Sequence, residues 1–278
     1  MFRTLKCDFS RVILNFSFLS AVLIIALLCF SEGIYTDPIN GKTYSTLESL
    51  LSLDKEFIYN NISFHSLSVV KTALSGYSSM ILPVTVSFPF VFAFITERNS
   101  ENIRYTISRT GEVKYCISKF TCAAASGGVC AMLGVMLFSL FCFMIFPSNM
   151  TEKLPQNTII IELLRKYIST FLYGLTSTMP AILLCSFCKN PYIILCLPFL
   201  GKFVLETVLS KIEIAGINNN DYDIFSKTQP LKPNSASVLP YLDLNTEFYI
   251  IVTVNIILIS ASAVCFVLIM VKRTDKGV

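Results

Sequence analysis

Long apolar runs alternate with shorter polar segments along the whole chain. A helix of about 20 apolar residues crosses the roughly 30 Å hydrocarbon core of a bilayer. Backbone polar groups in lipid must find partners within the protein, so each run predicts a helix, because barrel strands are shorter and alternate in polarity. Six runs qualify: 12–30, 76–95, 120–146, 168–188, 191–209 and 248–271. The sequence therefore predicts an all-α polytopic membrane protein with six transmembrane helices in one domain, 1–278.

The first and fifth runs are the least regular of the six. The first follows a basic N-terminal segment, as a secretory signal does. Its apolar stretch exceeds the usual length of about 7–15 residues, however, and no small-x-small cleavage site follows it. We therefore expect a retained anchor. The fifth run contains Pro198, Lys202 and Glu206, which interrupt its apolar pattern.

The charges of the polar segments predict that both termini are cytoplasmic. In that orientation the inner segments hold twelve Lys and Arg residues against five acidic ones. The outer loops 31–75, 147–167 and 210–247 hold nine Lys and Arg residues against twelve acidic ones. Basic residues near span ends favour the cytoplasmic side. Only 14% of the residues are charged, against about 25% in soluble domains, so we expect a multi-pass protein surrounded by lipid, without a nucleic-acid partner.

The inner segment 96–119 is too long for a tight turn, and its polar residues are regularly spaced. Several of them recur at the spacing of one helix face: Glu97, Glu101, Arg104, Tyr105 and Ser108. This spacing predicts an amphipathic helix along the membrane surface. Gly111 suits the C-terminal end of that helix, and Lys114 and Lys119 then anchor the entry to the next span at the interface. An ordinary positive-inside loop in contact with anionic lipid gives a similar charge pattern.

A linear pattern over residues 88–134 carries a resemblance to a known family. The apolar end of the second run leads into Thr96-Glu97-Arg98, and then follow Ser108-Arg109, Lys114-Tyr115, Lys119 and a span rich in glycine and alanine. This order resembles the permease subunits of type-2 ATP-binding-cassette exporters, including bacterial drug and bacteriocin-peptide export or self-protection systems. In those permeases a Glu-Arg pair opens a cytoplasmic coupling helix. Asn99-Ser100-Glu101 follows the pair here, where family members often have a further Glu and then a Gly, so the subfamily and the substrate stay open.

The resemblance implies a permease that forms the substrate path and couples to a separate ATPase. It assigns ATPase coupling to five residues: Glu97, Arg98, Glu101, Arg104 and Arg109. It also adds Tyr115 to Lys114 and Lys119 as interface anchors. The implied partners are an ATP-binding-cassette ATPase and a second permease copy or a sister permease. The implied location is a cell membrane, namely the bacterial plasma membrane.

The chain itself lacks the sequence features of an ATPase. It contains no P-loop or other Gly-rich phosphate cradle. We therefore expect no catalytic residue, metal or cofactor in this chain, with ATP and Mg held by the partner ATPase. The expected substrate is a peptide or a hydrophobic small molecule.

Two further patterns lie within the spans. Small residues crowd the third span and favour close helix packing, either within the chain or at a seam between two copies: Ala123, Ala124, Ala125, Ser126, Gly127, Gly128, Ala131 and Gly134. In the fifth span, Lys202 and Glu206 have the i, i+4 spacing of a helical ion pair. Ionisable residues within a span are functional candidates. The alternative is that the span ends near Lys202 and both residues are interfacial.

Two other functional classes stay open. A secondary transporter is expected to have ionisable groups at the membrane midplane and often inverted repeats, and neither is evident in the sequence. An intramembrane enzyme needs a nucleophile with a base, paired carboxylates or metal ligands at membrane depth. The six runs contain no His or Asp, and Glu206 is their only carboxylate.

Overall fold

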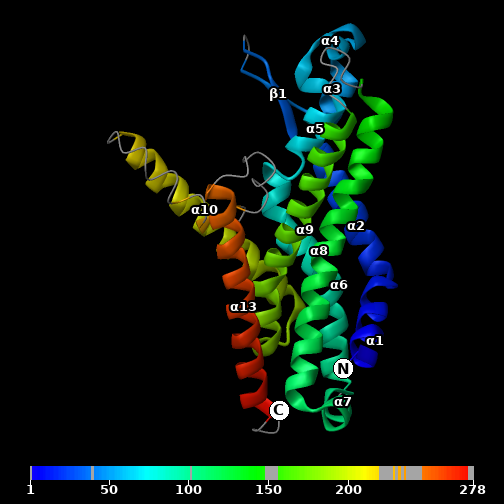
Figure 1. Ribbon diagram of the computed structural model, residues 1–278, viewed down its shortest axis with the longest axis vertical. Coiled ribbons are helices and arrows are strands. Elements are labelled where there is room, and N and C mark those ends of the chain that lie inside the picture. The colour runs from blue at the N-terminus through cyan, green and yellow to red at the C-terminus, as the bar shows by residue number, and fades with distance from the viewer. Residues whose placement is uncertain are drawn as a thin grey trace.

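The long apolar runs fold into long helices that lie side by side (Figure 1). The structure is a computed structural model that describes residues 2–38, 41–100, 102–147, 156–218, 228, 231–232, 235 and 246–274. The long helices are α2 (Phe16–Phe30), α6 (Tyr77–Asn99), α8 (Glu112–Ile145), α9 (Gln156–Phe187), α10 (Pro191–Asn218) and α13 (Thr246–Thr274). The prediction of a mostly helical, polytopic membrane protein is confirmed in this coarse form.

The number of crossings depends on how the N-terminal region is counted. Among the described residues, five helices are long and apolar enough to cross a membrane: α6, α8, α9, α10 and α13. A sixth crossing arises if α1 (Phe2–Ile13) and α2 form one span, which is bent by 56° between them. Asn15 caps α2 at this bend, where its side chain accepts a hydrogen bond from the N–H of Ser17 at 3.5 Å. The first predicted span is therefore not a straight helix.

The two ends of the bundle differ in structure. The N-terminal end of α1, the C-terminal end of α13 and the short helix α7 (Asn102–Thr110) lie together at one end, which we call the inner end (Figure 1). The opposite, outer end carries the antiparallel strands β1 (Gly33–Thr36) and β2 (Thr43–Ser45). Short helices follow the strands: α3 (Thr46–Ser52), α4 (Lys55–Asn60), η1 (Ile62–Phe64) and α5 (Ser66–Thr72). Termini at the same end agree with an even number of crossings.

The helices extend beyond the apolar runs that predicted them. α8 begins at Glu112, well before the predicted span 120–146. α9 begins at Gln156, so much of the predicted outer loop 147–167 is helical and continuous with the span. α10 continues to Asn218, and much of the remaining outer loop 210–247 lies outside the described residues. Hydropathy marks where a helix is in lipid, whereas the backbone hydrogen bonds continue past that boundary.

Small residues bring α8 close to its neighbours inside the chain. A Cβ atom on Gly128 would lie 2.8 Å from the ring of Phe171 on α9. A Cβ atom on Gly134 would lie 2.6 Å from a methyl carbon of Ile25 on α2. Interiors are close-packed, so these contacts leave no room for a larger side chain. Gly128 and Gly134 therefore pack against other helices of the same chain, which is the first of the two alternatives for the small residues of this span.

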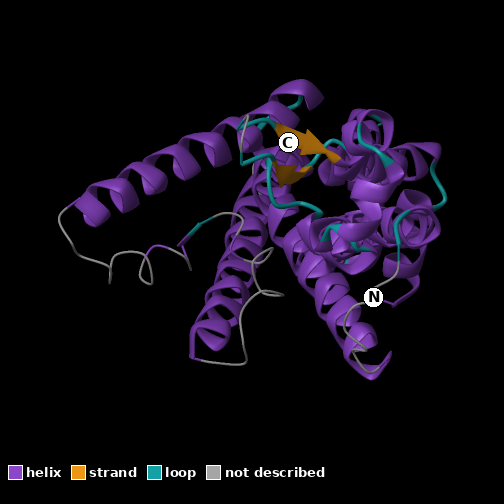
Figure 2. Cartoon of the chain, turned by 90° about the horizontal axis from the view of Figure 1, so that it is seen from above, coloured by secondary structure: helices purple, strands orange, loops and turns teal. Residues whose placement is uncertain are grey.

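The helix α10 lies at the edge of the bundle and leans away from it towards its outer end. Figure 1 shows this helix diverging from α9, and in the view from above it projects out of the bundle (Figure 2). Its apolar side chains Phe203, Val204 and Leu205 are 49, 57 and 54% exposed. The outer half of α10 therefore presents a largely uncovered apolar surface.

Candidate functional site

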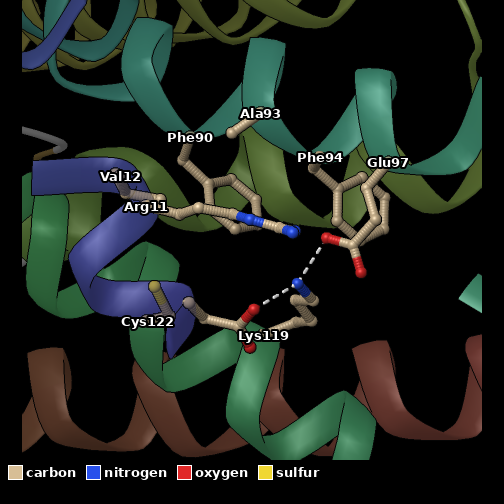
Figure 3. A pocket seen from close by; sticks show the side chains of 9 residues that line it. Arg11, Val12, Phe90, Ala93, Phe94, Glu97, Lys119 and Cys122 are labelled. Atoms are coloured by element: carbon tan, nitrogen blue, oxygen red, sulfur yellow. Dashed lines mark hydrogen bonds and ion pairs between the residues drawn. The ribbon is translucent and has the colours of Figure 1, made fainter. Parts of the chain in front are cut away.

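A buried cluster of charged side chains joins three helices at the inner end (Figure 3). The Nζ atom of Lys119 on α8 lies 2.7 Å from Oδ1 of Asp8 on α1 and 2.5 Å from Oε2 of Glu97 on α6. The side chain of Lys119 is 6% exposed, and those of Asp8 and Glu97 are 15 and 9% exposed. Charge-assisted hydrogen bonds of this kind are about twice as strong as neutral ones. The cluster therefore holds α1 and α6 against the first turns of α8.

Two hydroxyl groups complete what we call the Lys119 cluster, which consists of Asp8, Glu97, Tyr115, Ser118 and Lys119. The hydroxyl of Ser118 donates to Oδ2 of Asp8 at 3.2 Å. The hydroxyl of Tyr115 donates to Oε1 of Glu97 at 3.3 Å. The ammonium of Lys119 also lies 5.4 Å from the centre of the Tyr115 ring. Each of the four carboxylate oxygens thus has a donor within the cluster.

Helical periodicity explains how each side chain reaches this cluster. On α1 the apolar residues Leu5, Phe9 and Val12 have i, i+4, i+7 spacing and form one face. Val12 is buried, and Phe9 packs against the same apolar core. Asp8 lies beside this face and so meets α8. A small open pocket next to the cluster is lined by residues of α1, α6 and α8, and Arg11 extends along it towards Glu97 (Figure 3).

Arg98 points away from the cluster that holds its neighbour Glu97. Its guanidinium donates to the backbone carbonyls of Cys185 at 3.0 Å and Cys188 at 3.1 Å. These carbonyls belong to the C-terminal end of α9, where the last four carbonyls of a helix lack partners within the helix. A cation at this position also interacts favourably with the helix dipole. The Glu-Arg pair therefore joins the inner end of α6 to α1 and α8 on one side and to α9 on the other.

The predicted single helix face across segment 96–119 is not formed. α6 ends at Asn99, Ser100 caps it, and α7 begins at Asn102. The pair Glu97-Arg98 therefore belongs to the end of α6, separated by a break from the residues on α7. The physical reason is that the apolar helix α6 continues through the polar residues that follow the apolar run.

The remaining predicted coupling residues lie on or next to α7. Arg109 is exposed on α7. Glu101 lies outside the described residues, as does the side chain of Arg104. Gly111 follows α7 with φ +81°, and its N–H donates to the carbonyl of Ile107 at 2.8 Å. The prediction that Gly111 ends this helix is confirmed, since positive φ suits glycine.

Of the three predicted interface anchors, only Lys114 is exposed. Tyr115 and Lys119 are 2 and 5% exposed and lie inside the Lys119 cluster. These two side chains contact other helices of the chain, because α8 begins early enough to bury this turn against α1 and α6, and their role at a membrane interface stays a prediction. Asp8 was not predicted, since the N-terminal segment was considered only for its basic residues. The apolar spacing of Leu5, Phe9 and Val12 was the signal that could have revealed a helix there.

A second group of polar side chains lies near the outer end of α6. The ammonium of Lys202 on α10 contacts the backbone carbonyl of Ser79 on α6 and the hydroxyl of Tyr173 on α9. That hydroxyl donates to the same Ser79 carbonyl at 2.7 Å. Lys202 is 6% exposed, and its Nζ lies 4.6 Å from the centre of the Tyr173 ring. α10 continues beyond Lys202 to Asn218, so Lys202 lies within a helix and not at its end.

The predicted pair between Lys202 and Glu206 does not form a direct contact. No ion pair joins these two side chains, both of which the structure describes. The Oε1 atom of Glu206 is buried and has no hydrogen-bond partner. Lys202 therefore contacts a backbone carbonyl of α6 and a hydroxyl of α9, whereas Oε1 of Glu206, one turn away, has no hydrogen-bond donor.

Comparison with protein-family models and with curated proteins gives no match. Among the described residues, no group of three or more His, Cys, Asp and Glu side chains is placed to hold a metal ion. The features of the molecule that point to a function are the two polar groups and the arrangement of α6, α7 and α8.

Proposed function

We propose that this chain is the membrane-spanning permease subunit of an ATP-driven exporter of the type-2 ATP-binding-cassette class. The observation that chiefly supports this proposal is the connection between α6, α7 and α8 at the inner end. A short helix lies between two long apolar helices, and the residues at its base are tied into the bundle by Glu97 and Arg98. A membrane-surface helix fixed in this way suits the transmission of movement from a partner protein.

In this proposal the polar residues at the inner end have two different roles. Arg109 and Tyr105 are exposed on α7, where Tyr105 is 73% exposed, and they offer a docking surface to the ATPase. Charges on such a surface set partner choice and orientation more than affinity. Glu97 and Arg98 transmit the movement, since a displacement of α7 pulls on α8 through Lys119 and on α9 through its last carbonyls. α1 moves with them because Asp8 shares Lys119.

The rest of the assembly is proposed by the same reasoning. The ATPase would hold ATP and Mg, and a second copy of the chain or a sister permease would complete the substrate path. The apolar surfaces left open on α10 and α13 support a path for a peptide or a hydrophobic small molecule, in the plasma membrane of a bacterium. Leu258 and Leu268, for example, are 58 and 64% exposed on α13.

A secondary transporter is the second candidate, and one observation favours it. Lys202 is an ionisable group buried inside a span, which is the kind of residue such transporters use. The two candidates differ in their energy source. Transport that stops when an ion gradient is collapsed, and that continues when a partner ATPase is inactivated, would favour the secondary transporter.

The experiment that tests the proposal is an affinity pull-down of the tagged chain from its native membranes. The wild type is compared with Tyr105→Ala/Arg109→Glu on α7 and with Lys272→Glu as the matched control. Lys272 is also exposed at the inner end, on α13. We expect an ATP-binding-cassette ATPase with the wild type and the control, and at least tenfold less with the α7 variant.

Two outcomes of the pull-down would change the proposal. Equal recovery with the α7 variant would move the docking surface away from α7 but keep the class. No ATPase with folded wild-type protein would contradict the exporter and favour the secondary transporter.

A further inference from the structure

Glu206 differs from the other carboxylates described in the long helices and their ends. Asp8 and Glu97 share Lys119, and Glu32 accepts hydrogen bonds from the N–H and hydroxyl of Ser78. Oε2 of Glu162 has Lys71 at 2.8 Å. Only at Glu206 does a buried carboxylate oxygen have neither a hydrogen-bond donor nor an ion-pair partner among the described residues. Buried polar atoms in proteins nearly always have a partner, so an exception calls for a ligand or another explanation.

The ammonium of Lys202, one turn away, does not donate to this oxygen. The ammonium of Lys202 is engaged on the other side, with the Ser79 carbonyl and the Tyr173 hydroxyl. Its positive charge offsets that of Glu206 from a distance without donating to it. Lys202 and Glu206 have i, i+4 spacing, so they form a short polar stripe on one face of α10. Ionisable groups within a span usually line such a functional path.

The surroundings of the stripe determine what kind of molecule reaches it. The outer half of α10 leans out of the bundle, as both overall views show (Figures 1 and 2). The side chain of Glu206 is only half-buried, and the exposed apolar residues Phe203 and Leu205 lie on neighbouring faces of the helix. A molecule dissolved in the bilayer can therefore approach the carboxylate along α10. It must present N–H donors and positive charge at one end and an apolar body at the other.

We propose that Glu206 is the anchor of a binding site for ligands that carry a protonated amine on an apolar body. The ammonium donates to the carboxylate of Glu206, and the apolar body lies along the exposed side chains of α10. The proposal rests on the proposed function in one respect, since it makes this class of molecule the substrate of the exporter. Lys202 is a positioning residue that holds α10 against α6 and α9, so that the carboxylate is presented at a fixed place.

Direct binding to the purified full chain in lipid nanodiscs tests this site. The probe is a dansyl-labelled alkyl amine, and the matched probe is the same molecule with a hydroxyl in place of the amine. The variants are Glu206→Gln, which keeps the shape and removes the charge, and Glu213→Gln as control. Glu213 lies on the same helix outside this stripe and already has partners, Thr228 at 2.6 Å and Lys232 at 2.8 Å.

We expect Glu206→Gln to weaken binding of the amine at least tenfold and to change binding of the hydroxyl probe less than twofold. Glu213→Gln should change neither probe by more than twofold. Retained binding of the hydroxyl probe also shows that the variant is folded. Unchanged amine binding in Glu206→Gln, equal weakening of both probes, or no amine binding to the wild type would each overturn the proposal.

A second copy of the chain is the competing occupant of this face, and a separate arm distinguishes it. A photo-crosslinking amino acid at Leu205, the exposed neighbour of Glu206, is expected to label lipid and to leave the chain monomeric on a denaturing gel. A crosslinked dimer would mean that another copy covers Glu206, and it would overturn the ligand site. Neither assay needs an ATPase, so the proposal of the binding site and the proposal of the exporter can each be contradicted without the other. Amine binding with no ATPase in the pull-down would contradict only the exporter.

Discussion

The positive charges of two buried lysines, Lys119 and Lys202, are compensated by different kinds of group. Lys119 lies between two carboxylates from two other helices, and each carboxylate oxygen in its cluster has a donor. Lys202 has no carboxylate in contact, and it is held by a backbone carbonyl and a tyrosine hydroxyl. The carboxylate that the sequence placed one turn away from it is left with a buried, unsatisfied oxygen.

This difference separates a structural connection from a candidate binding site. In the Lys119 cluster, charges compensate one another within the chain, so removing one partner leaves another buried and unpaired. Near Lys202 the dipoles satisfy the ammonium, and the unsatisfied group is a carboxylate next to an open apolar surface. A closed cluster suits the transmission of movement at the inner end, whereas an incomplete one suits a molecule that enters and leaves.

The largest effect should come from Lys119→Met, which leaves Asp8 and Glu97 buried without their cation. Breaking a buried ion pair in this way costs about 3–5 kcal/mol. We expect a loss of that size in the free energy of unfolding, measured by denaturant titration in mixed micelles, together with faster tryptic cleavage at Lys6 and Arg11 as α1 is released.

Lys114→Met is the control for Lys119→Met, because Lys114 is an exposed lysine on the same helix. It should change the free energy of unfolding by no more than about 0.5 kcal/mol. If the two variants were equally stable, the Lys119 cluster would not hold α1 in place.

A smaller effect is expected from Lys202→Met, because the groups left behind are dipoles rather than charges. The Ser79 carbonyl keeps its hydrogen bond from the Tyr173 hydroxyl at 2.7 Å. The loss in free energy of unfolding should therefore be about 1–3 kcal/mol, as for hydrogen bonds to a charged group. Lys211→Met, at an exposed lysine on α10, is the control in the same unfolding titration. A loss as large as that of Lys119→Met would mean that Lys202 and Glu206 act as an ion pair.

The smallest effect on stability should come from Glu206→Gln, which removes no hydrogen bond that the described residues make to Oε1. We expect a change within about 0.5 kcal/mol in the same titration, in contrast to its large expected effect on amine binding. The combination of unchanged stability and lost amine binding is the clearest sign that the two lysine environments differ in role. A loss of several kcal/mol would instead place Glu206 in the folding core of the bundle.

The local pattern of the sequence predicted most of the helices but only part of the candidate site. The apolar runs predicted the long helices because hydrophobic length has a direct counterpart in bilayer thickness. Gly111 was predicted correctly because a positive φ is a local property of one residue. The break after Asn99 was not predicted, since helical spacing continues across it in the sequence.

Charge partners across long sequence distances could not be predicted from spacing. Asp8, Glu97 and Lys119 are brought together by the packing of α1, α6 and α8, and nothing local to any of them identifies the other two. The i, i+4 spacing of Lys202 and Glu206 allowed a pair, but no ion pair joins them in the fold. Tertiary contacts with Ser79 and Tyr173 compete for the same ammonium and are the ones observed.

The sequence by itself determined that the chain is a helical, multi-pass membrane protein, because long apolar runs have few other stable solutions in lipid. It also determined which residues are chemically able to carry charge near the spans. Only the tertiary structure decided how those charges are used, because satisfaction of a buried charge depends on which helices pack against it. In the packed structure Lys119 contacts Asp8 and Glu97, and Arg98 donates to carbonyls at the end of α9. Oε1 of Glu206 has no partner among the described residues, and its helix leans away from the bundle.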